Sequence, residues 1–338
     1  MRLHRKLSKQ KKILFSIFIG TLTLLIVSFL SLTYGAKAVS LADVRDALLG
    51  QGDSFTVNVV RARIPRTIFG LLAGAALSVS GVLMQTITRN PIADPSILGV
   101  NTGASLFIVC GISLLHIQSK LSYIGFAFAG AMLTALLVYK LASMGYGGAT
   151  PMKLALSGAA VSTALSSLVS AFVIPDSSVM TTFRFWQIGS IGGVSTEDIL
   201  YLLPITLFII VCSYAMAGDL NILLLSEESA TALGLHVTRT RLLAALLGVL
   251  LCSVTTALAG PISFIGLMVP HVIRMLLDSD LKLLIPFSAL YGSSVLLFSD
   301  ILGRVLGRPG ELESGIMTAL LGAPCFIWII RKAKVQSL

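Results

Sequence analysis

The sequence predicts an all-α integral membrane protein with about ten transmembrane helices and both termini in the cytoplasm. Of its 338 residues, 55% are hydrophobic and only 12% are charged, and the mean hydropathy is +0.92. A soluble domain carries about 25% charged residues, so most of this chain cannot face water. Apolar stretches of membrane-spanning length recur, and basic residues flank the first and the last of them. Residues 1–338 are therefore interpreted as a single transmembrane domain.

A membrane-crossing helix needs about 20 predominantly apolar residues. Such stretches run over Ile13–Tyr34, Thr67–Thr88, Pro95–Leu115, Leu121–Tyr139, Leu154–Ile174, Ile199–Ala217, Leu283–Leu302 and Ser314–Ile330. The apolar segment Leu242–Ile273 is too long for one span. Gly260-Pro261 divides it into two spans, because proline ends a helix and glycine permits the turn.

An even number of spans places both termini on the same side of the membrane, and both termini are basic. The basic N-terminus, residues 1–12, and the segment after the last span carry Arg2, Arg5, Lys6, Lys9, Lys11, Lys12, Arg331, Lys332 and Lys334. The positive-inside rule assigns such residues to the cytoplasm. The net charge of +10 is thus typical of a protein embedded in membrane lipid, and nucleic acid is not a predicted partner.

Five arginines depart from this rule, because they fall at the predicted outer ends of spans. They are Arg61, Arg63, Arg66, Arg304 and Arg308. One interpretation is that their side chains reach lipid phosphates. The other, which we favour, is an exposed cationic rim that docks an acidic partner outside the cell.

Two outer connections are longer than simple turns. Within the outer segment 35–62, Ser40 and Asp43 form a plausible capping box and Gly50 a plausible stop, which predicts a short helix on the outer surface. The second connection, Pro175–Asp198, is rich in Ser, Thr and Gly and is predicted to be a loop.

A third connection, residues 218–240, lies on the cytoplasmic side. Ser226 can cap a helix whose first turn holds Glu227 and Glu228, where acidic residues favour the helix dipole. Gly234 suits the left-handed position after its end. A solvated loop is the alternative, but a compact helix here favours an element that docks a cytoplasmic partner. Its predicted contact residues are Glu227, Glu228, Ala230, Leu233 and Gly234.

Six groups of residues occur in a recognisable order. They are Arg63-Ile64-Pro65-Arg66, Arg89-Asn90-Pro91-Ile92-Ala93-Asp94-Pro95, Trp186-Gln187-Ile188-Gly189-Ser190, Ala230-Thr231-Ala232-Leu233-Gly234, Gly260-Pro261-Ile262-Ser263-Phe264-Ile265-Gly266-Leu267 and Gly315-Ile316-Met317-Thr318-Ala319. Together they resemble the FecCD family, the permeases of type II ABC importers for iron-siderophores, haem and cobalamin. The resemblance spans roughly residues 39 to 331. Where that family usually reads E-L-P-x-G, this chain has Glu313 in place of the proline, and Ser314 is expected to supply a cap instead.

The resemblance implies a non-catalytic permease of the bacterial cytoplasmic membrane. Two such chains, identical or paralogous, would form the channel, two ABC ATPases would dock in the cytoplasm, and an extracytoplasmic binding protein would deliver the substrate. An iron-siderophore is the favoured substrate because it is the commonest in the family, with haem and cobalamin as alternatives.

The resemblance also implies roles for particular residues. Arg63, Arg66 and Arg304 match positions that pair with glutamates of the binding protein. Segment 227–234 matches the ATPase-coupling loop. The fifth predicted span would line the pathway with Ser157, Ser162, Ser166 and Ser170.

Several functions are disfavoured by missing patterns. The sequence contains no phosphate-binding G-x-x-x-x-G-K-[ST], no H-E-x-x-H and no G-x-S-x-G. We therefore predict no catalytic residue, no cofactor and no metal site, and His271 lacks a second ligand at metal spacing. An ion-coupled secondary transporter is the more distant alternative. It usually needs ionisable groups at mid-membrane, and the span centres have none.

Overall fold

The computed structural model describes residues 2–37, 39–145, 149–277 and 279–336. The side chains of residues 2–9, 329–330 and 332–336 lie outside this description. The predicted basic groups at Arg2, Arg5, Lys6, Lys9, Lys332 and Lys334 fall among them.

Throughout the described residues the chain is helical or irregular, which confirms the all-α prediction. Seven helices are long and apolar enough to cross a membrane: α1 (Arg2–Thr33), α3 (Phe55–Thr88), α5 (Lys120–Ser143), α6 (Pro151–Val173), α8 (Thr196–Ala215), α11 (Val237–Ala259) and α13 (Leu281–Leu306). Three shorter helices are also apolar: α4 (Val100–Leu115), α12 (Ile265–Leu276) and α14 (Ser314–Gln336). Each predicted span corresponds to one of these helices. Five small elements complete the fold: α2 (Leu41–Leu48), η1 (Pro95–Leu98), α7 (Ser177–Ile188), α9 (Ala217–Leu223) and α10 (Glu227–Ala232).

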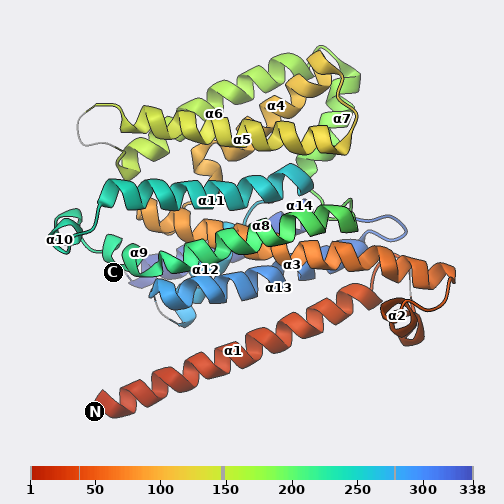
Figure 1. The fold of residues 1–338 in the computed structure, drawn as a ribbon, viewed down its shortest axis with the longest axis horizontal. Coiled ribbons are helices and arrows are strands. Elements are labelled where there is room, and N and C mark those ends of the chain that lie inside the picture. The colour runs from red at the N-terminus through yellow and green to blue at the C-terminus, as the bar shows by residue number, and fades with distance from the viewer. Residues whose placement is uncertain (1, 38, 146–148, 278, 337–338) are drawn as a thin grey trace.

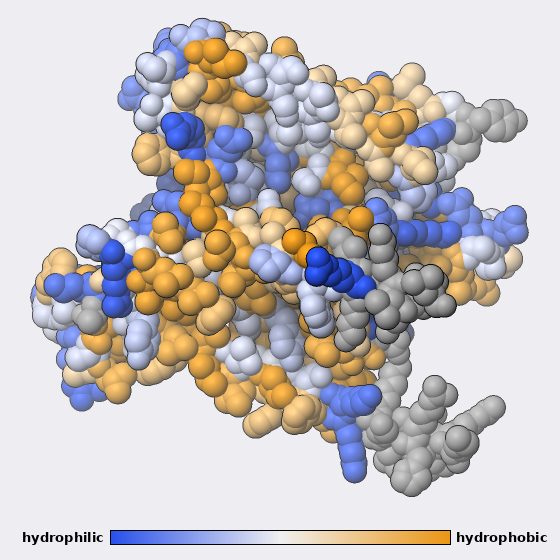
Figure 2. Space-filling view, turned by 180° about the vertical axis from the view of Figure 1, so that it is seen from behind, coloured by the Kyte–Doolittle hydropathy of each residue, from blue (hydrophilic) through white to orange (hydrophobic). Residues whose placement is uncertain are grey.

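The long helices run side by side along one axis (Figure 1). α10 lies at one end of the bundle, and α1 begins and α14 ends near that same end, whereas α2 and α7 lie at the opposite end. α3 is central, with 78% of its apolar window buried, whereas α1 has 11% buried and α6 only 6%. α1 and α6 are therefore left to contact lipid or another chain. A broad apolar surface is visible in Figure 2, as a bilayer requires.

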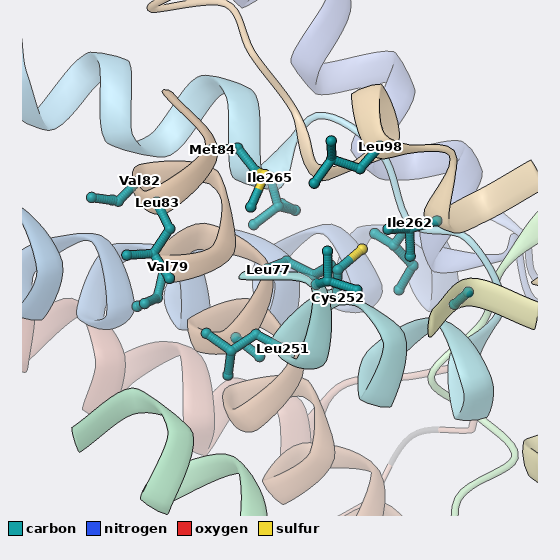
Figure 3. Close-up of a cluster of buried hydrophobic side chains, with 14 of the residues drawn as sticks. Leu77, Val79, Val82, Leu83, Met84, Leu98, Leu251, Cys252, Ile262 and Ile265 are labelled. Carbon is teal, nitrogen blue, oxygen red and sulfur yellow. The ribbon is translucent and has the colours of Figure 1, made fainter. Parts of the chain in front are cut away.

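α3 can occupy the centre because glycines bring its backbone against neighbouring segments. A Cβ at Gly81 would lie 1.8 Å from the carbonyl oxygen of Gly266, and one at Gly74 would lie 2.4 Å from that of Gly292. Only glycine permits such contact, which is how helices associate closely in lipid. Figure 3 shows the adjoining core, where Leu77 and Cys252 lie among other buried aliphatic side chains. Cys252 is a free cysteine, only 3% exposed, and packs there as a small hydrophobic residue.

The predicted helix within segment 35–62 is present as α2. Ser40 accepts a hydrogen bond from the backbone N–H of Asp43, and the Asp43 carboxylate accepts one from the N–H of Ser40, which completes the capping box. Gly50 follows the helix with φ of 70°. This local motif was readable because all of its partners lie within a few residues.

Two boundaries differ from the prediction. The connection Pro175–Asp198, expected to be a loop, is largely the helix α7, which Asp176 caps through the backbone N–H groups of Ser178 and Val179. Its inner face buries Val179 and Phe183 among many exposed polar residues, so the hydrophobic signal was weak. The third predicted span began at Pro95, but α4 begins only at Val100. Gly99, with φ of 72°, separates it from η1.

Candidate functional site

The outer candidate site, named for the side of the membrane that the sequence predicts for it, is centred on the carboxylate of Asp300 in α13, which is fully buried. Arg66 of α3 donates to it from Nη2 to Oδ1 at 2.8 Å and from Nε to Oδ2 at 3.1 Å. Arg66 also donates from Nη1 to Glu311 Oε2 at 2.6 Å. Glu311 follows α13, and its side chain is 41% exposed. Arg66 thus joins one buried carboxylate and one that reaches solvent.

Arg304 completes the charge cluster one helical turn after Asp300. Its Nε lies 2.9 Å from Asp300 Oδ2, and the arginine is only 1% exposed. Its Nη1 donates to the carbonyl oxygens of Ser31 and Tyr34, and its Nη2 donates to Ser31 Oγ. Arg304 therefore ties α13 to the end of α1, whose last carbonyls have no partner within their own helix.

Arg63 ties α3 to the end of α1 in the same way. Its Nη1 donates to the carbonyl oxygens of Leu32 and Thr33 at 3.0 and 3.1 Å, and its Nη2 donates to that of Lys37 at 2.7 Å. The expectation that Arg63, Arg66 and Arg304 are exposed is therefore wrong, since they are 7%, 9% and 1% exposed. Guanidinium groups serve well here because each has five donors for carboxylates and helix-end carbonyls.

The inner candidate site is α10, which projects beyond the ends of the long helices (Figure 1). Ser226 caps it by accepting from the backbone N–H of Ser229, as the sequence predicted. Gly234 adopts the left-handed conformation with φ of 83°. The N–H of Gly234 donates to the carbonyl of Thr231, and that of Leu235 to the carbonyl of Ala230, which is a Schellman motif.

The surface of α10 is presented to solvent. Among the predicted contact residues, Glu227, Glu228 and Gly234 are exposed and Leu233 is 63% exposed, whereas Ala230 is fully buried. An exposed leucine beside two glutamates gives this helix an apolar and an acidic face. Ala230 instead anchors the helix to the body of the protein.

Two arginines bind the α10 segment at this end of the bundle. Arg89, at the end of α3, donates to the carbonyl oxygens of Leu223 and Leu225, just before α10. Arg241 of α11 donates from Nη2 to Glu227 Oε1 at 2.6 Å. This hydrogen bond lowers the pKa of Glu227 below its ordinary value, and the positive charge of Arg241 adds to the effect. α10 is therefore exposed on one side and tethered on the other.

The serines predicted to line a pathway lie on α6, away from both charge clusters. Ser166 and Ser170 are exposed, and Ser157 and Ser162 are half-buried. Ser162 Oγ accepts from Thr102 Oγ1 of α4 at 3.2 Å, whereas Ser170 Oγ donates back to the carbonyl of Ser166. Bonds of the second kind satisfy the hydroxyls within their own helix and leave a smooth surface.

The sequence interpretation missed Asp300 and Glu311 as partners of the arginines. The spacing of Asp300 and Arg304, one helical turn apart, was the available signal for the first. No local pattern pointed to Arg66, which lies 234 residues from Asp300.

Ser314 also differs from the expectation, because its Oγ accepts from the backbone N–H of Ile191 rather than from its own helix. Among the described residues, no group of three or more His, Cys, Asp or Glu side chains could hold a metal ion.

A bundle of seven long and three shorter apolar helices, among the described residues, is that of a multi-pass membrane protein. The FecCD transport family matches residues 22–332, and the chain belongs to this family.

Relatives support this over nearly the full length. The chain is 41% identical to the ferric enterobactin transport system permease protein FepD of Escherichia coli K12, over 92% of this chain and 93% of that protein. It is 39% identical to the Fe(3+)-citrate import system permease protein YfmD of Bacillus subtilis 168, over 90% and 91%. A solved inward-facing structure assigned to the metal-chelate type of ABC transporter superposes with a TM-score of 0.82 at 28% identity, covering 95% of this chain and 99% of that one.

Proposed function

We propose that this chain is the permease subunit of an ATP-driven importer that moves a ferric siderophore into the bacterial cytoplasm. The observation that carries the proposal is the 41% identity, over 92% of the chain, to a permease named for ferric enterobactin transport. A relative named for hemin transport, 35% identical over 81% of this chain, keeps haem as a second candidate.

The proposed assembly contains a second permease chain, two cytoplasmic ABC ATPases and an extracytoplasmic binding protein. The permease itself catalyses no reaction, binds no cofactor, and draws its energy from the ATPases. Both termini and α10 face the cytoplasm, since they lie at one end of the bundle (Figure 1) and the terminal segments are basic.

α10 is the proposed ATPase contact. Its exposed residues Glu227, Glu228 and Leu233 project past the bundle, where a partner can enclose them. Gly234 and the buried Ala230 fix its shape, so that a displacement imposed on α10 moves it as a unit. A coupling element needs both properties, exposure to the partner and a defined connection to the membrane helices.

The opposite end is the proposed docking face for the binding protein, through Arg63, Arg66 and Arg304. Because these side chains already have partners within this chain, a glutamate of the binding protein would dock by replacing one of those partners. Glu311, which is 41% exposed, is the one carboxylate partner of the three arginines that an incoming glutamate could replace. Arg63 and Arg304 would hold the ends of α1, α3 and α13 in place beneath it.

α6 is the proposed pathway-lining helix, with Ser157, Ser162, Ser166 and Ser170, of which Ser166 and Ser170 are exposed. Hydroxyls that bond within their own helix give a mildly polar surface with little adhesion, which suits rapid passage of a bulky chelate. Specificity would then reside in the binding protein.

Reconstitution tests the proposal directly. The permease is placed in proteoliposomes with a second permease chain, an ABC ATPase and an extracytoplasmic binding protein, and uptake of ferric enterobactin, ferric citrate and hemin is measured with and without ATP. ATP-dependent uptake of one ferric siderophore, and not of hemin, is expected. Selective uptake of hemin would replace the substrate assignment. Uptake driven by an ion gradient without ATP would refute the importer mechanism.

A further inference from the structure

Arg241 joins three segments that are far apart in the sequence. It lies in the first turns of α11 and is only 5% exposed. Its Nη2 donates to Glu227 Oε1 of α10 at 2.6 Å, and its Nη1 donates to the carbonyl oxygen of Ala149 at 2.8 Å. Ala149 immediately precedes Thr150, the residue that caps α6. One guanidinium group therefore bridges α10 and the beginning of α6.

The bridge is suited to transmit movement. The bond to Glu227 is charge-assisted and short, and the planar guanidinium holds its two bonds in a fixed relative geometry. Because Arg241 is only 5% exposed and its Nε is already buried without a partner, breaking either bond would leave a further guanidinium N–H unpaired in an apolar environment. A displacement of Glu227 is thus resisted by the same rigid group that holds Ala149.

At the other end of the bridge, Ala149 is connected to α6 through only one residue. Thr150 accepts at its carbonyl oxygen from the N–H of Leu154, and its hydroxyl accepts from the N–H of Lys153. The first turn of α6 therefore follows any shift of this segment. α6 is also far less enclosed than α3, because 6% of its apolar window is buried, compared with 78% for α3.

We propose that Arg241 is a positioning residue that transmits displacement of α10 to α6. The inference rests on the proposed function, in which an ATPase moves α10 and α6 lines the pathway. Hydrogen-bonded and packed segments are the physical route by which distant sites become coupled. Arg89 has a different part, since it ties the α9–α10 connection to the central and immobile α3.

The test uses the complete transporter in lipid nanodiscs. The native cysteines are replaced by alanine, and Ser167→Cys places a thiol on the exposed face of α6. The labelling rate by a polar thiol reagent is compared with and without a non-hydrolysable ATP analogue. The variants are Arg241→Gln, Glu227→Ala and the double variant. Arg239→Gln is the matched control, because Arg239 is exposed in the same helical turn and pairs with no carboxylate in the described part of the chain.

We expect the nucleotide-dependent change in labelling to fall about 5-fold or more in both single variants, which is the lower range for coupled sites. The ATPase still co-purifies, and Arg239→Gln keeps the full response. The double variant is no worse than the more affected single variant, because both substitutions interrupt the same route.

A full nucleotide response in Arg241→Gln with the ATPase bound would overturn the relay and leave the proposed function intact. Additive losses in the double variant would also overturn it. If the wild-type permease bound no ATPase, the proposed function would fail and the relay with it. If Arg241→Gln did not fold, Glu227→Ala would decide in complexes that keep the ATPase bound, because the Glu227 side chain is 51% exposed and tolerates truncation.

Discussion

At the end of the bundle that carries α2, Arg66 and Arg304 enclose the carboxylate of Asp300, and all three residues are at most 9% exposed. At the end that carries α10, Arg241 is equally buried, but its partner Glu227 has a side chain that is 51% exposed. Both ends rely on arginines that reach across several helices. They differ in that Arg66 and Arg304 share a fully buried carboxylate, that of Asp300, whereas the carboxylate that Arg241 binds is half-exposed.

The cluster around Asp300 is therefore suited to anchor helices, and the pair of Arg241 and Glu227 is suited to respond to a partner. Removing one member of a buried ion pair leaves an uncompensated charge, so the cluster around Asp300 resists any change. A half-exposed pair is weaker and can be pulled, screened or exchanged. The outer cluster therefore fixes the helix ends, and the inner pair holds a segment that a partner can move.

The largest effect is expected from Asp300→Asn, which leaves Arg66 and Arg304 without their shared counter-charge. Breaking a buried pair in this way costs roughly 3–5 kcal/mol. We expect a marked loss of the folded, detergent-stable protein in thermal unfolding monitored by fluorescence size-exclusion. Asp53→Asn is the control, because Asp53 pairs with Arg61 while its side chain is 93% exposed. Equal stability of the two variants would contradict an anchoring role for the outer cluster.

The next effect concerns the shape of the inner element. Gly234→Val places a β-branched residue at φ of 83°, which costs roughly 1–2 kcal/mol. Gly218→Ala is the matched control, since it also has open space around it but lies in α9 with an ordinary backbone. We expect stimulation of ATP hydrolysis by the loaded binding protein to drop only for Gly234→Val. Normal stimulation in this variant would show that the end of α10 takes no part in coupling.

Glu311→Gln is expected to have a smaller effect on stability, and it should strengthen the docking of the binding protein. It removes the exchangeable partner of Arg66 while the Asp300 pair stays in place. Stability falls by only about 0.2–1 kcal/mol, because the lost pair is partly exposed. Docking of the binding protein, measured by biolayer interferometry on nanodiscs, becomes tighter because Arg66 is released. Weaker docking would mean that Glu311 itself belongs to the contact surface.

The smallest effect is a pH dependence at α10. The hydrogen bond from Arg241 lowers the pKa of Glu227, so the contact favours the ionised carboxylate. Its stabilisation is fully present above the ordinary glutamate pKa and is lost as the pH falls through the lower folded-state value. A nitroxide at Leu233→Cys, in a background without native cysteines, should become more mobile below that pH. In Glu227→Ala the mobility should not change with pH, and a shared pH profile would assign the effect elsewhere.

Much of the fold follows from local sequence. The ten apolar stretches became helices because a helix pairs its own backbone N–H and C=O groups, which lipid cannot do. The caps at Ser40 and Ser226 and the left-handed Gly234 form as expected, since each motif is complete within a few residues. α7 was missed because half of its residues are polar and its flanks resemble a polar loop.

The sequence by itself determined that this chain is a membrane bundle, where its spans lie, and which short segments cap themselves. Only the tertiary structure decided what the arginines do. Arg66 meets Asp300, 234 residues away, and Arg241 meets Ala149, 92 residues away. Hydropathy and capping depend on neighbours along the chain. The partner of a charged side chain depends on which helices pack together, and in this chain the packing turned three of the five arginines of the predicted exposed rim into buried anchors.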